Sequence, residues 1–139
     1  MSLYIFDTDV LSLLQYNHPK VMQQCVAHFY DDLAITIISV EEQLAGWYSR
    51  LRQAKTPDDL AEQYHRMTET VEMLRQFDVI TFAKTDILRY QQLAALKLGV
   101  GKSDLRIAAI ALEHNAVVVT RNRRDFQRVP GLAIEDWSQ

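Results

Sequence analysis

The stretch LYIFDTDVLSLL, residues 3–14, sets the interpretation of the whole chain. Its first four residues are large and apolar and predict a buried strand, and its last seven have the spacing of a short amphipathic helix. Two acids, Asp7 and Asp9, stand at the junction. A strand-to-helix turn needs only Asn, Gly or Ser, so two carboxylates there indicate either a helix cap or a cation site.

Strands and helices are predicted to alternate along the rest of the chain. Apolar, β-branched runs predict strands at Leu3–Phe6, Leu33–Ile38, Val79–Phe82, Ala116–Thr120 and Leu132–Ile134. Helical spacing predicts helices over Thr8–Tyr16, from Pro19 to about Tyr30, after Ser39, from Pro57 to about Leu74, over Thr85–Leu98 and over Asp104–Asn115. This alternation is typical of an α/β fold with three layers, in which a central parallel sheet of four to five strands is covered on both faces.

Several local features refine this prediction. Ser39 has a glutamate, Glu42, three residues later, which predicts a capping box, and Ser103 is the predicted cap of the last long helix. In the second helix we expect Val26 and Phe29 to be buried with Val21 and Cys25. In the long fourth helix the predicted apolar stripe is formed by Leu60, Tyr64, Met67, Val71 and Leu74.

Composition narrows the class of protein. A chain of 139 residues fits a single domain, residues 1–139, with a sizeable core. A net charge of −3 does not indicate a broad basic surface for nucleic acid. One cysteine excludes an internal disulfide and a cysteine-rich zinc site. With no apolar run long enough to cross a bilayer and no signal peptide at the start, we expect a cytoplasmic protein with no membrane partner.

Four acids fall at comparable places in the predicted fold. Asp7 follows the first strand, Glu42 lies in the first turn after the second, Asp104 opens a helix, and Asp125 comes shortly after the strand AVVVT. Because ligands bind beyond the carboxyl ends of parallel strands, we expect these side chains to converge at one edge of the sheet.

A group of carboxylates without Cys or His predicts a particular chemistry. Clustered carboxylates repel one another unless a cation compensates, and oxygen ligands favour Mg²⁺ or Mn²⁺. Such a cation supports phosphodiester hydrolysis. Each acid also has a local explanation, because Asp7 can cap a helix, Glu42 can serve the capping box, Asp104 suits a helix N-terminus, and Asp125 can be a solvated loop residue.

Three segments resemble the PIN domain, and specifically the VapC-type toxin ribonucleases. They are YIFDTDVLSLL, ISVEEQLAG and SDLRIAAIALEHNAVVVTRNRRDFQRVPGLAIEDW. Within them, D-x-x-I-A-A-x-A-L, V-V-V-T-x-N-x-x-D-F and V-P-G-L follow in order, preceded by E-x-x-x-G from Glu42 to Gly46. The resemblance covers nearly the whole chain and implies a PIN-like α/β/α domain with the activity of a Mg²⁺- or Mn²⁺-dependent endoribonuclease.

The resemblance assigns roles to the acids. Asp7, Glu42 and Asp104 match the central acidic positions and are the implied catalytic residues and metal ligands. Two residues are candidates for the fourth acidic position. Many relatives have Asp where this chain has Asn122. Other relatives have Asn at that position and an acid three residues later, which matches Asn122 and Asp125 here. We assign Asp125 as the fourth catalytic and metal-binding acid, with Asn122 as its polar partner.

Further polar residues are implied to surround the acids. Asp9 stands where Asn is common and adds negative charge, Thr120 resembles a small hydroxyl residue beside the metal, and Ser39 is a further polar contributor. All three are predicted to act behind the metal ligands rather than as ligands themselves.

Basic residues follow the strand AVVVT. Arg121, Arg123 and Arg124 are predicted to contact RNA, because guanidinium groups pair well with phosphate, although a solvated surface is an equal alternative. Proteins with this resemblance are usually the toxin half of a type II toxin–antitoxin pair. The implied partners are therefore an RNA substrate, a cognate antitoxin and a second copy of the chain in a homodimer.

Two other functions remain as alternatives. D-T-D after a strand resembles the nucleophile motif of haloacid-dehalogenase-type phosphatases, which would use Asp7 covalently. A catalytically silent module that binds RNA or protein would keep the fold without the chemistry. The sequence leaves open the RNA target, the number of cations and the choice between Asp125 and Asn122.

Overall fold

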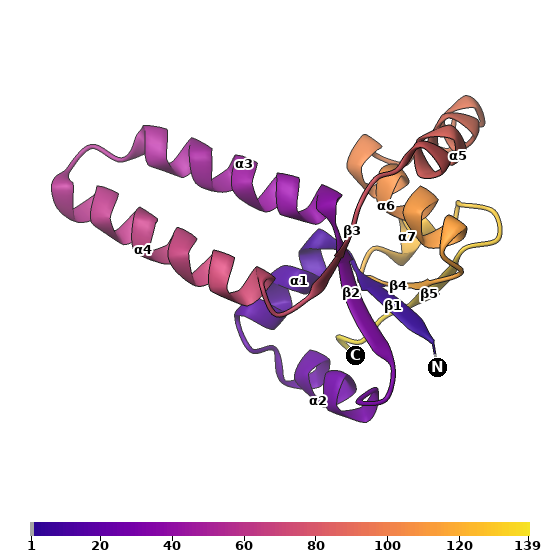
Figure 1. Cartoon of the computed structure of the whole chain (residues 1–139), viewed down its shortest axis with the longest axis horizontal. Coiled ribbons are helices and arrows are strands. Elements are labelled where there is room, and N and C mark those ends of the chain that lie inside the picture. The colour runs from indigo at the N-terminus through magenta and orange to yellow at the C-terminus, as the bar shows by residue number, and fades with distance from the viewer. Residues whose placement is uncertain (1) are drawn as a thin grey trace.

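The computed structural model describes residues 2–139, which form five strands and seven helices (Figure 1). The strands are β1 (Leu3–Phe6), β2 (Asp32–Thr36), β3 (Asp78–Ile80), β4 (Val117–Val119) and β5 (Ala133–Glu135). The helices are α1 (Thr8–Gln15), α2 (Pro19–Ala27), α3 (Ile37–Gln53), α4 (Pro57–Leu74), α5 (Lys84–Ala95), α6 (Lys102–Glu113) and α7 (Arg123–Phe126).

The five strands form one parallel sheet in the order β3-β2-β1-β4-β5. Strand β1 lies at the centre, with Ile5 opposite Ala34 of β2 and opposite Val118 of β4. The predicted parallel α/β architecture is therefore confirmed. Because β1 and β4 are adjacent although more than a hundred residues separate them, the chain crosses over the sheet and leaves the carboxyl ends of both strands at the same edge.

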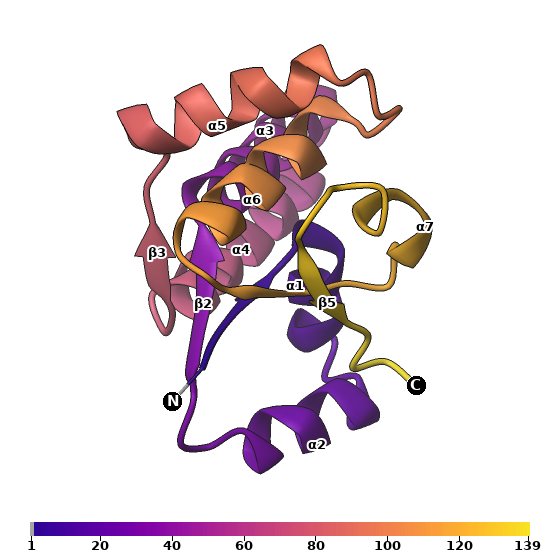
Figure 2. The same ribbon diagram turned by 90° about the vertical axis from the view of Figure 1, so that its right-hand side faces the viewer.

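Alternate residues of the central strands supply two separate cores. Ile5 and Val118 pack with the buried residues of α5 and α6 on one face of the sheet. Tyr4, Phe6 and Val119 pack with buried residues of α1, α2 and α4 on the other. Figure 2 shows α5 and α6 on one side of the strands and α2 on the other. This two-sided burial explains why the central strands are continuously apolar instead of alternating with polar residues.

Helices α3 and α4 form a long antiparallel hairpin that extends away from the sheet (Figure 1). Much of the predicted apolar stripe on α4 is accordingly open to solvent, since Leu60, Tyr64 and Val71 are exposed and Leu74 is buried only at the end that returns to the sheet. The helical period was predicted correctly, but burial was not. A two-helix hairpin beyond the sheet has only one neighbour to cover its apolar side chains.

Two predicted helix caps are wrong. Helix α3 begins at Ile37, and its cap is Thr36, whose hydroxyl accepts a hydrogen bond from the amide of Ser39. Ser39 is thus inside the helix, and the capping box with Glu42 does not form. Helix α6 is preceded by Gly101 as its cap, so Ser103 also lies within the helix. Both helices therefore begin before the serine that was predicted to cap them.

Two further differences concern the edges of the molecule. Val26 and Phe29, predicted to be buried, are 75% and 74% exposed. Only Val21 of helix α2 is fully buried, and Phe29 lies beyond the end of this helix at Ala27. The short helix α7 was not predicted, since TRNRRDF has no apolar period to reveal a single turn. No helix among residues 2–139 is long and apolar enough to span a membrane.

One glycine has no conformational reason to be where it is. Gly46 lies inside α3, and a Cβ atom built on it would meet no other atom within 4 Å. A glycine in a helix interior costs stability because the unfolded chain loses more freedom on folding.

Replacement of this glycine by alanine, Gly46→Ala, is expected to raise the free energy of unfolding by roughly 0.5–1 kcal/mol. Urea denaturation followed by circular dichroism measures the change. Gly131→Ala is the matched control, because Gly131 has a φ of +78° and an alanine there is strained, so this variant should lose stability. A Gly46→Ala protein less stable than the unsubstituted chain would contradict the assignment of open space at this position.

Candidate active site

Asp7 joins the central strand to the first helix. It directly follows β1, and its Oδ1 atom accepts a hydrogen bond of 2.9 Å from the amide of Val10, which caps α1. Its Oδ2 atom accepts a hydrogen bond of 2.6 Å from the hydroxyl of Thr120, just beyond β4. Asp7 is therefore both a helix cap and a buried carboxylate shared by two strands, with only 3% of its surface exposed.

Burial makes this carboxyl group unusually basic. Loss of solvent raises the pKa of Asp7 to about 6, although the donors Thr120 and Val10 oppose the shift. The negative charges of Asp9 and Asp104 add to the increase in the pKa. A group with this pKa changes its protonation close to neutral pH, and a cation bound nearby would favour its ionised form.

Glu42 approaches the same edge of the sheet from α3. The Thr8 hydroxyl donates to Oε1 of Glu42 at 2.5 Å, and it also lies 2.9 Å from the Ser39 hydroxyl. These contacts connect the start of α1 to the start of α3. Ser39 is fully buried and forms a polar contact of this link, and it does not cap the helix as predicted.

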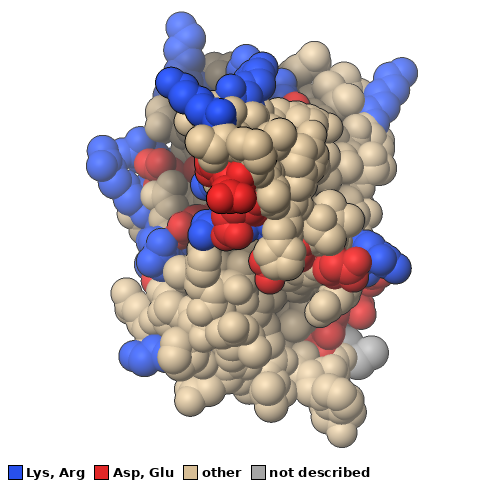
Figure 3. All heavy atoms as spheres, turned by 90° about the vertical axis from the view of Figure 1, so that its left-hand side faces the viewer, with Lys and Arg blue, Asp and Glu red and all other residues tan. Residues whose placement is uncertain are grey.

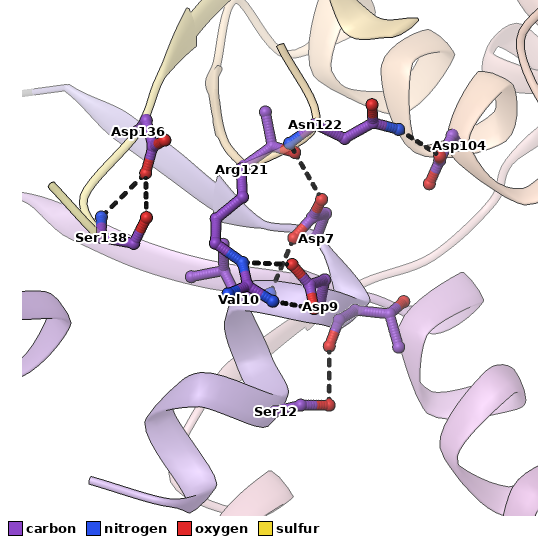
Figure 4. Close-up of polar contacts among 11 residues, drawn as sticks. Asp7, Asp9, Val10, Ser12, Asp104, Arg121, Asn122, Asp136 and Ser138 are labelled. Carbon is purple, nitrogen blue, oxygen red and sulfur yellow. Dashed lines mark hydrogen bonds and ion pairs between the residues drawn. The ribbon is translucent and has the colours of Figure 1, made fainter. Parts of the chain in front are cut away.

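Asn122 bridges the two remaining acids. Its Nδ2 atom donates to Oδ2 of Asp125 at 2.9 Å and lies 3.4 Å from Oδ2 of Asp104, as Figure 4 shows for Asn122 and Asp104. The amide of Asn122 donates to the Thr120 hydroxyl at 2.8 Å. One asparagine thus connects Asp104 and Asp125 to Thr120 and, through Thr120, to Asp7. The structure places both candidates for the fourth position at the same edge.

The acids also influence one another electrostatically. Burial raises the pKa of Asp104, and the charge of Glu42 raises it further, followed by the charge of Asp125. Asp7 and Asp104 are similarly coupled. Four elements of the chain, β1, α3, α6 and α7, therefore bring negative charge to one region, as the order of the acids in the sequence predicted.

Asp9 has a different partner. Its two carboxylate oxygens accept hydrogen bonds of 2.8 and 2.9 Å from Nε and Nη2 of Arg121, so the pair is bidentate (Figure 4). Asp9 raises the pKa of Arg121 by this contact. Both side chains are about half exposed at the rim of the acidic region. An aspartate engaged in this way is poorly placed to act as a proton donor, which disfavours the phosphatase alternative.

The other predicted arginines lie beside this rim. Arg123 and Arg124 occupy the exposed first turn of α7, and neither forms an ion pair with another residue of the described chain, 2–139. Arg128 lies 3.8 Å from a carboxylate oxygen of Asp125. Two guanidinium groups without a carboxylate partner therefore stand next to the acids.

One polar residue of the site was missed in the sequence. Thr8 was predicted only as the first residue of a helix, yet its hydroxyl is the contact between Glu42 and the β1–α1 junction. The sequence offered only a weak signal, a hydroxyl residue between two acids in D-T-D, because the partners of Thr8 are Ser39 and Glu42, more than thirty residues away.

The donor set suits a hard divalent cation. Within residues 2–139, no three side chains of His, Cys, Asp or Glu form a group that could hold a metal ion as they stand. The carboxylates instead accept hydrogen bonds from Thr8, Thr120 and Asn122. Their oxygen chemistry and mutual repulsion nevertheless fit Mg²⁺ or Mn²⁺.

The chain is an α/β/α domain in which acidic side chains gather where the parallel strands end, with no cysteine or histidine among them. These features define the class of α/β domains with an acidic site at this edge of the sheet. A family model described as the PIN domain matches residues 4–132. The chain belongs to the PIN domain family, as its sequence motifs predicted.

Within this family the chain is similar to named ribonucleases. It is 28% identical to "Ribonuclease VapC1" of Haemophilus influenzae strain R2866 over 144 aligned residues, covering 99% of each chain. It is 25% identical to "tRNA(fMet)-specific endonuclease VapC" of Shigella flexneri, covering 97% of this chain and 98% of the relative.

Solved structures show the same fold. VapBC-1 from nontypeable Haemophilus influenzae superimposes with a TM-score of 0.75 at 26% identity, covering 99% of both chains. VapBC2 from Rickettsia felis, bound to a DNA fragment from its promoter, superimposes with a TM-score of 0.78 at 23% identity and covers 97% of this chain and 98% of the other.

The raised pKa of Asp7 has a consequence for stability without cations. Between pH about 4 and about 6, the folded chain holds a proton on Asp7 that the unfolded chain releases, so stability due to this group is greatest below pH 4 and is lost as pH rises through about 6. Asp7→Asn removes the buried charge and keeps an acceptor for the Val10 amide. We expect it to be more stable than the unsubstituted chain at pH 7 by on the order of 2 kcal/mol.

Urea denaturation in EDTA from pH 4 to pH 8 measures this difference, which should disappear toward pH 4. Asp78→Asn is the matched control, because Asp78 is exposed at the start of β3. A constant difference between Asp7→Asn and the unsubstituted chain over this pH range would contradict the raised pKa of Asp7.

Proposed function

We propose that this PIN domain is a divalent-cation-dependent endoribonuclease of the VapC type, acting as the toxin of a type II toxin–antitoxin pair. The observation that carries the proposal is the shared network in which Asp7, Asp104 and Asp125 meet through Thr120 and Asn122. The similarity to proteins named ribonuclease VapC1 and tRNA(fMet)-specific endonuclease VapC supports RNA as the substrate.

Asp7, Asp104 and Asp125 would hold one or two divalent cations, with Glu42 binding directly or through a water. Mg²⁺ is the proposed cation and Mn²⁺ the alternative, because both prefer carboxylate oxygens. When bound, the cation polarises a phosphate oxygen and lowers the pKa of water.

The chain's own residues contribute orientation. Val10 and Thr120 fix both oxygens of Asp7, so this carboxylate is already aligned before a substrate arrives. Asn122 fixes Asp104 relative to Asp125 in the same way. Thr8 holds Oε1 of Glu42 and leaves Oε2 to orient the attacking water. Water adds to phosphorus, the bond to the 3′ oxygen breaks, and the 3′ oxygen takes a proton.

The arginines beside the acids are proposed to hold the RNA backbone. Arg123 and Arg124 are exposed and lack carboxylate partners among the described residues, so they are available to phosphate. Arg121 is already bound to Asp9, and its role is to keep a positive charge at the rim.

The proposed partners follow from the same comparison. Several structures of similar fold are VapBC complexes of a toxin with its antitoxin, which supports a cognate antitoxin for this chain. We also propose a homodimer and a cytoplasmic location, where RNA is the substrate.

Cleavage of a mixed RNA pool that contains transfer RNA tests the activity. We expect cutting with Mg²⁺ or Mn²⁺ and none with EDTA. Asp7→Asn and Asp104→Asn should each lower the rate by about 10²–10³, the usual effect of losing one electrostatic contact to a transition state. Gel analysis of end-labelled RNA measures the rates.

Asp78→Asn serves again as the control and should cut at the normal rate, because Asp78 is exposed on the edge strand β3, which β2 separates from β1. Equal cutting by Asp7→Asn, Asp104→Asn and the unsubstituted chain would overturn the assignment of the acidic site. Hydrolysis of a small phosphate ester instead of RNA would favour the phosphatase.

Phosphate contacts of the arginines are tested by the salt dependence of RNA binding. In an Asp104→Asn background, which removes cutting, Arg123→Ala and Arg124→Ala should each reduce the slope of log Kd against log salt by about 0.7, the effect of one phosphate contact on single-stranded nucleic acid. Fluorescence anisotropy with labelled RNA measures Kd. Arg75→Ala, an exposed arginine at the end of α4, is the control and should leave the slope unchanged. Unchanged slopes in both test variants would show that α7 is a solvated surface.

A further inference from the structure

A recess runs along the line where α1 faces α3, beginning at the acids. It has a volume of about 170 Å³, and Thr8 and Glu42 form one end of it. Arg50 lies at the other end, eight residues further along α3, which is roughly 12 Å by the rise of a helix. The recess therefore continues the candidate active site along the surface.

Gly46 forms part of the wall of this recess, one turn after Glu42. The residue is exposed, and no contact inside the chain requires a glycine, because a Cβ atom there would meet nothing within 4 Å. A side chain at this position would project into open space at the recess. The missing side chain keeps the backbone of α3 accessible to something outside the chain.

The lining is rich in polar groups that are weakly engaged. Nε2 of Gln43 donates to the Ser12 hydroxyl at 3.4 Å, and Nε2 of Gln15 donates to Oε1 of Gln43 at 3.4 Å. Both distances are at the long end for hydrogen bonds, so these amides can exchange partners at little cost. Side-chain amides in this arrangement match the donors and acceptors on the edge of a nucleobase.

A cation and an aromatic ring complete the recess. The guanidinium carbon of Arg50 lies 4.6 Å from the centre of the Trp47 ring, and Arg50 forms no ion pair within residues 2–139. Trp47 is itself buried, whereas Tyr16 at the far rim is 79% exposed. Arg50 is thus free to meet a phosphate, and Tyr16 offers a ring on which a base can stack.

This chemistry fits an RNA strand better than an amphipathic peptide helix. A peptide helix needs a mainly apolar floor, but the only large apolar lining residue that is buried, Trp47, is covered by Arg50. Figure 3, which looks onto the end where the α3–α4 hairpin projects, shows Lys and Arg beside Asp and Glu on this side of the molecule. A surface that carries both positive and negative side chains together with side-chain amides is compatible with a nucleic acid bound through local contacts.

We propose that the recess between α1 and α3 is a subsite for the RNA nucleotides that flank the bond to be cleaved. Gln15, Gln43 and Ser12 contact a base, and Arg50 binds the neighbouring phosphate. The proposal rests on the proposed ribonuclease function and adds where the substrate lies and which residues select its sequence.

The test fills the recess from a position where an added Cβ atom meets no other atom within 4 Å. Gly46→Trp places a large ring in the open space, and Ala45→Trp is the matched control at the neighbouring exposed position, which is outside the recess. In an Asp104→Asn background, Kd for labelled single-stranded RNA dodecamers of random sequence is measured by fluorescence anisotropy. We expect Gly46→Trp to weaken binding by about tenfold or more, the effect of losing one stacked or paired base, and Ala45→Trp to leave it unchanged.

A second readout addresses base selection. Gln43→Leu, made with Asp104 intact, should relax the sequence preference next to the cut when the cleaved ends of a mixed RNA pool are sequenced. A loss of folding alone would lower all cutting without changing this preference. Circular dichroism of each variant confirms that the fold is retained.

The outcomes separate the two proposals. If the unsubstituted chain cuts no RNA but the Asp104→Asn protein binds RNA in a manner that depends on position 46, the recess is supported only as an RNA-binding site, and both the nuclease function and the assignment to nucleotides beside a cleaved bond are overturned. If RNA is cut but Gly46→Trp and Ala45→Trp bind it equally well, the subsite is overturned and the nuclease function stands. Loss of antitoxin binding in Gly46→Trp with unchanged RNA affinity would assign the recess to the protein partner and also overturn the subsite.

Discussion

The hydrogen bond from Thr120 to Asp7 is the contact on which the candidate site depends. It joins the carboxyl ends of the two central strands, β1 and β4, within a region from which water is excluded. The other oxygen of Asp7 holds the first turn of α1, and the Thr120 hydroxyl in turn accepts from the amide of Asn122. One buried carboxylate thereby fixes the relative positions of the end of β1, the start of α1 and the segment that leads into α7, where Asp125 lies. The stability lost by burying its charge is the physical reason for its raised pKa.

The same edge of the sheet shows how the chain maintains an acidic group without a cation. Thr8 donates to Glu42, Thr120 donates to Asp7, and Asn122 donates to both Asp104 and Asp125, while Arg121 neutralises Asp9 at the rim. These three donors carry no charge, so they hold the carboxylates in place without neutralising them. The arrangement is therefore consistent with a domain that folds first and acquires its cation afterward. It also explains why carboxylates that influence one another's pKa do not yet surround a common point.

The sequence predicted the structure best where the type of residue and the order of the strands indicated the same feature. The run LYIF, the strand AVVVT and the placement of Asp7, Glu42 and Asp104 after predicted strands or at helix starts were sufficient for the parallel sheet and for one acidic edge. Local details were less accessible. Ser39 and Ser103 look like caps, but Thr36 and Gly101 precede the helices, because the packing of Ile38 and Leu105 into the core sets where each helix begins. Phe29 is exposed beyond the end of α2 at Ala27, and the α4 stripe is exposed because the α3–α4 hairpin extends beyond the sheet (Figure 1). No short window of sequence contains either fact.

The order of the active-site residues along the chain has a consequence for biosynthesis. Asp7 is made first, whereas Thr120 and Asn122, which orient it and the neighbouring acids, are made 113 and 115 residues later. Strand β4 must also pair with β1 before the ends of these two strands lie side by side. Such a long-range pairing forms slowly compared with local helices. A nascent chain still attached to the ribosome therefore lacks an assembled site until residues 117–122 have been translated. For a protein that hydrolyses RNA, this delay would protect the translating ribosome and its message from the unfinished enzyme.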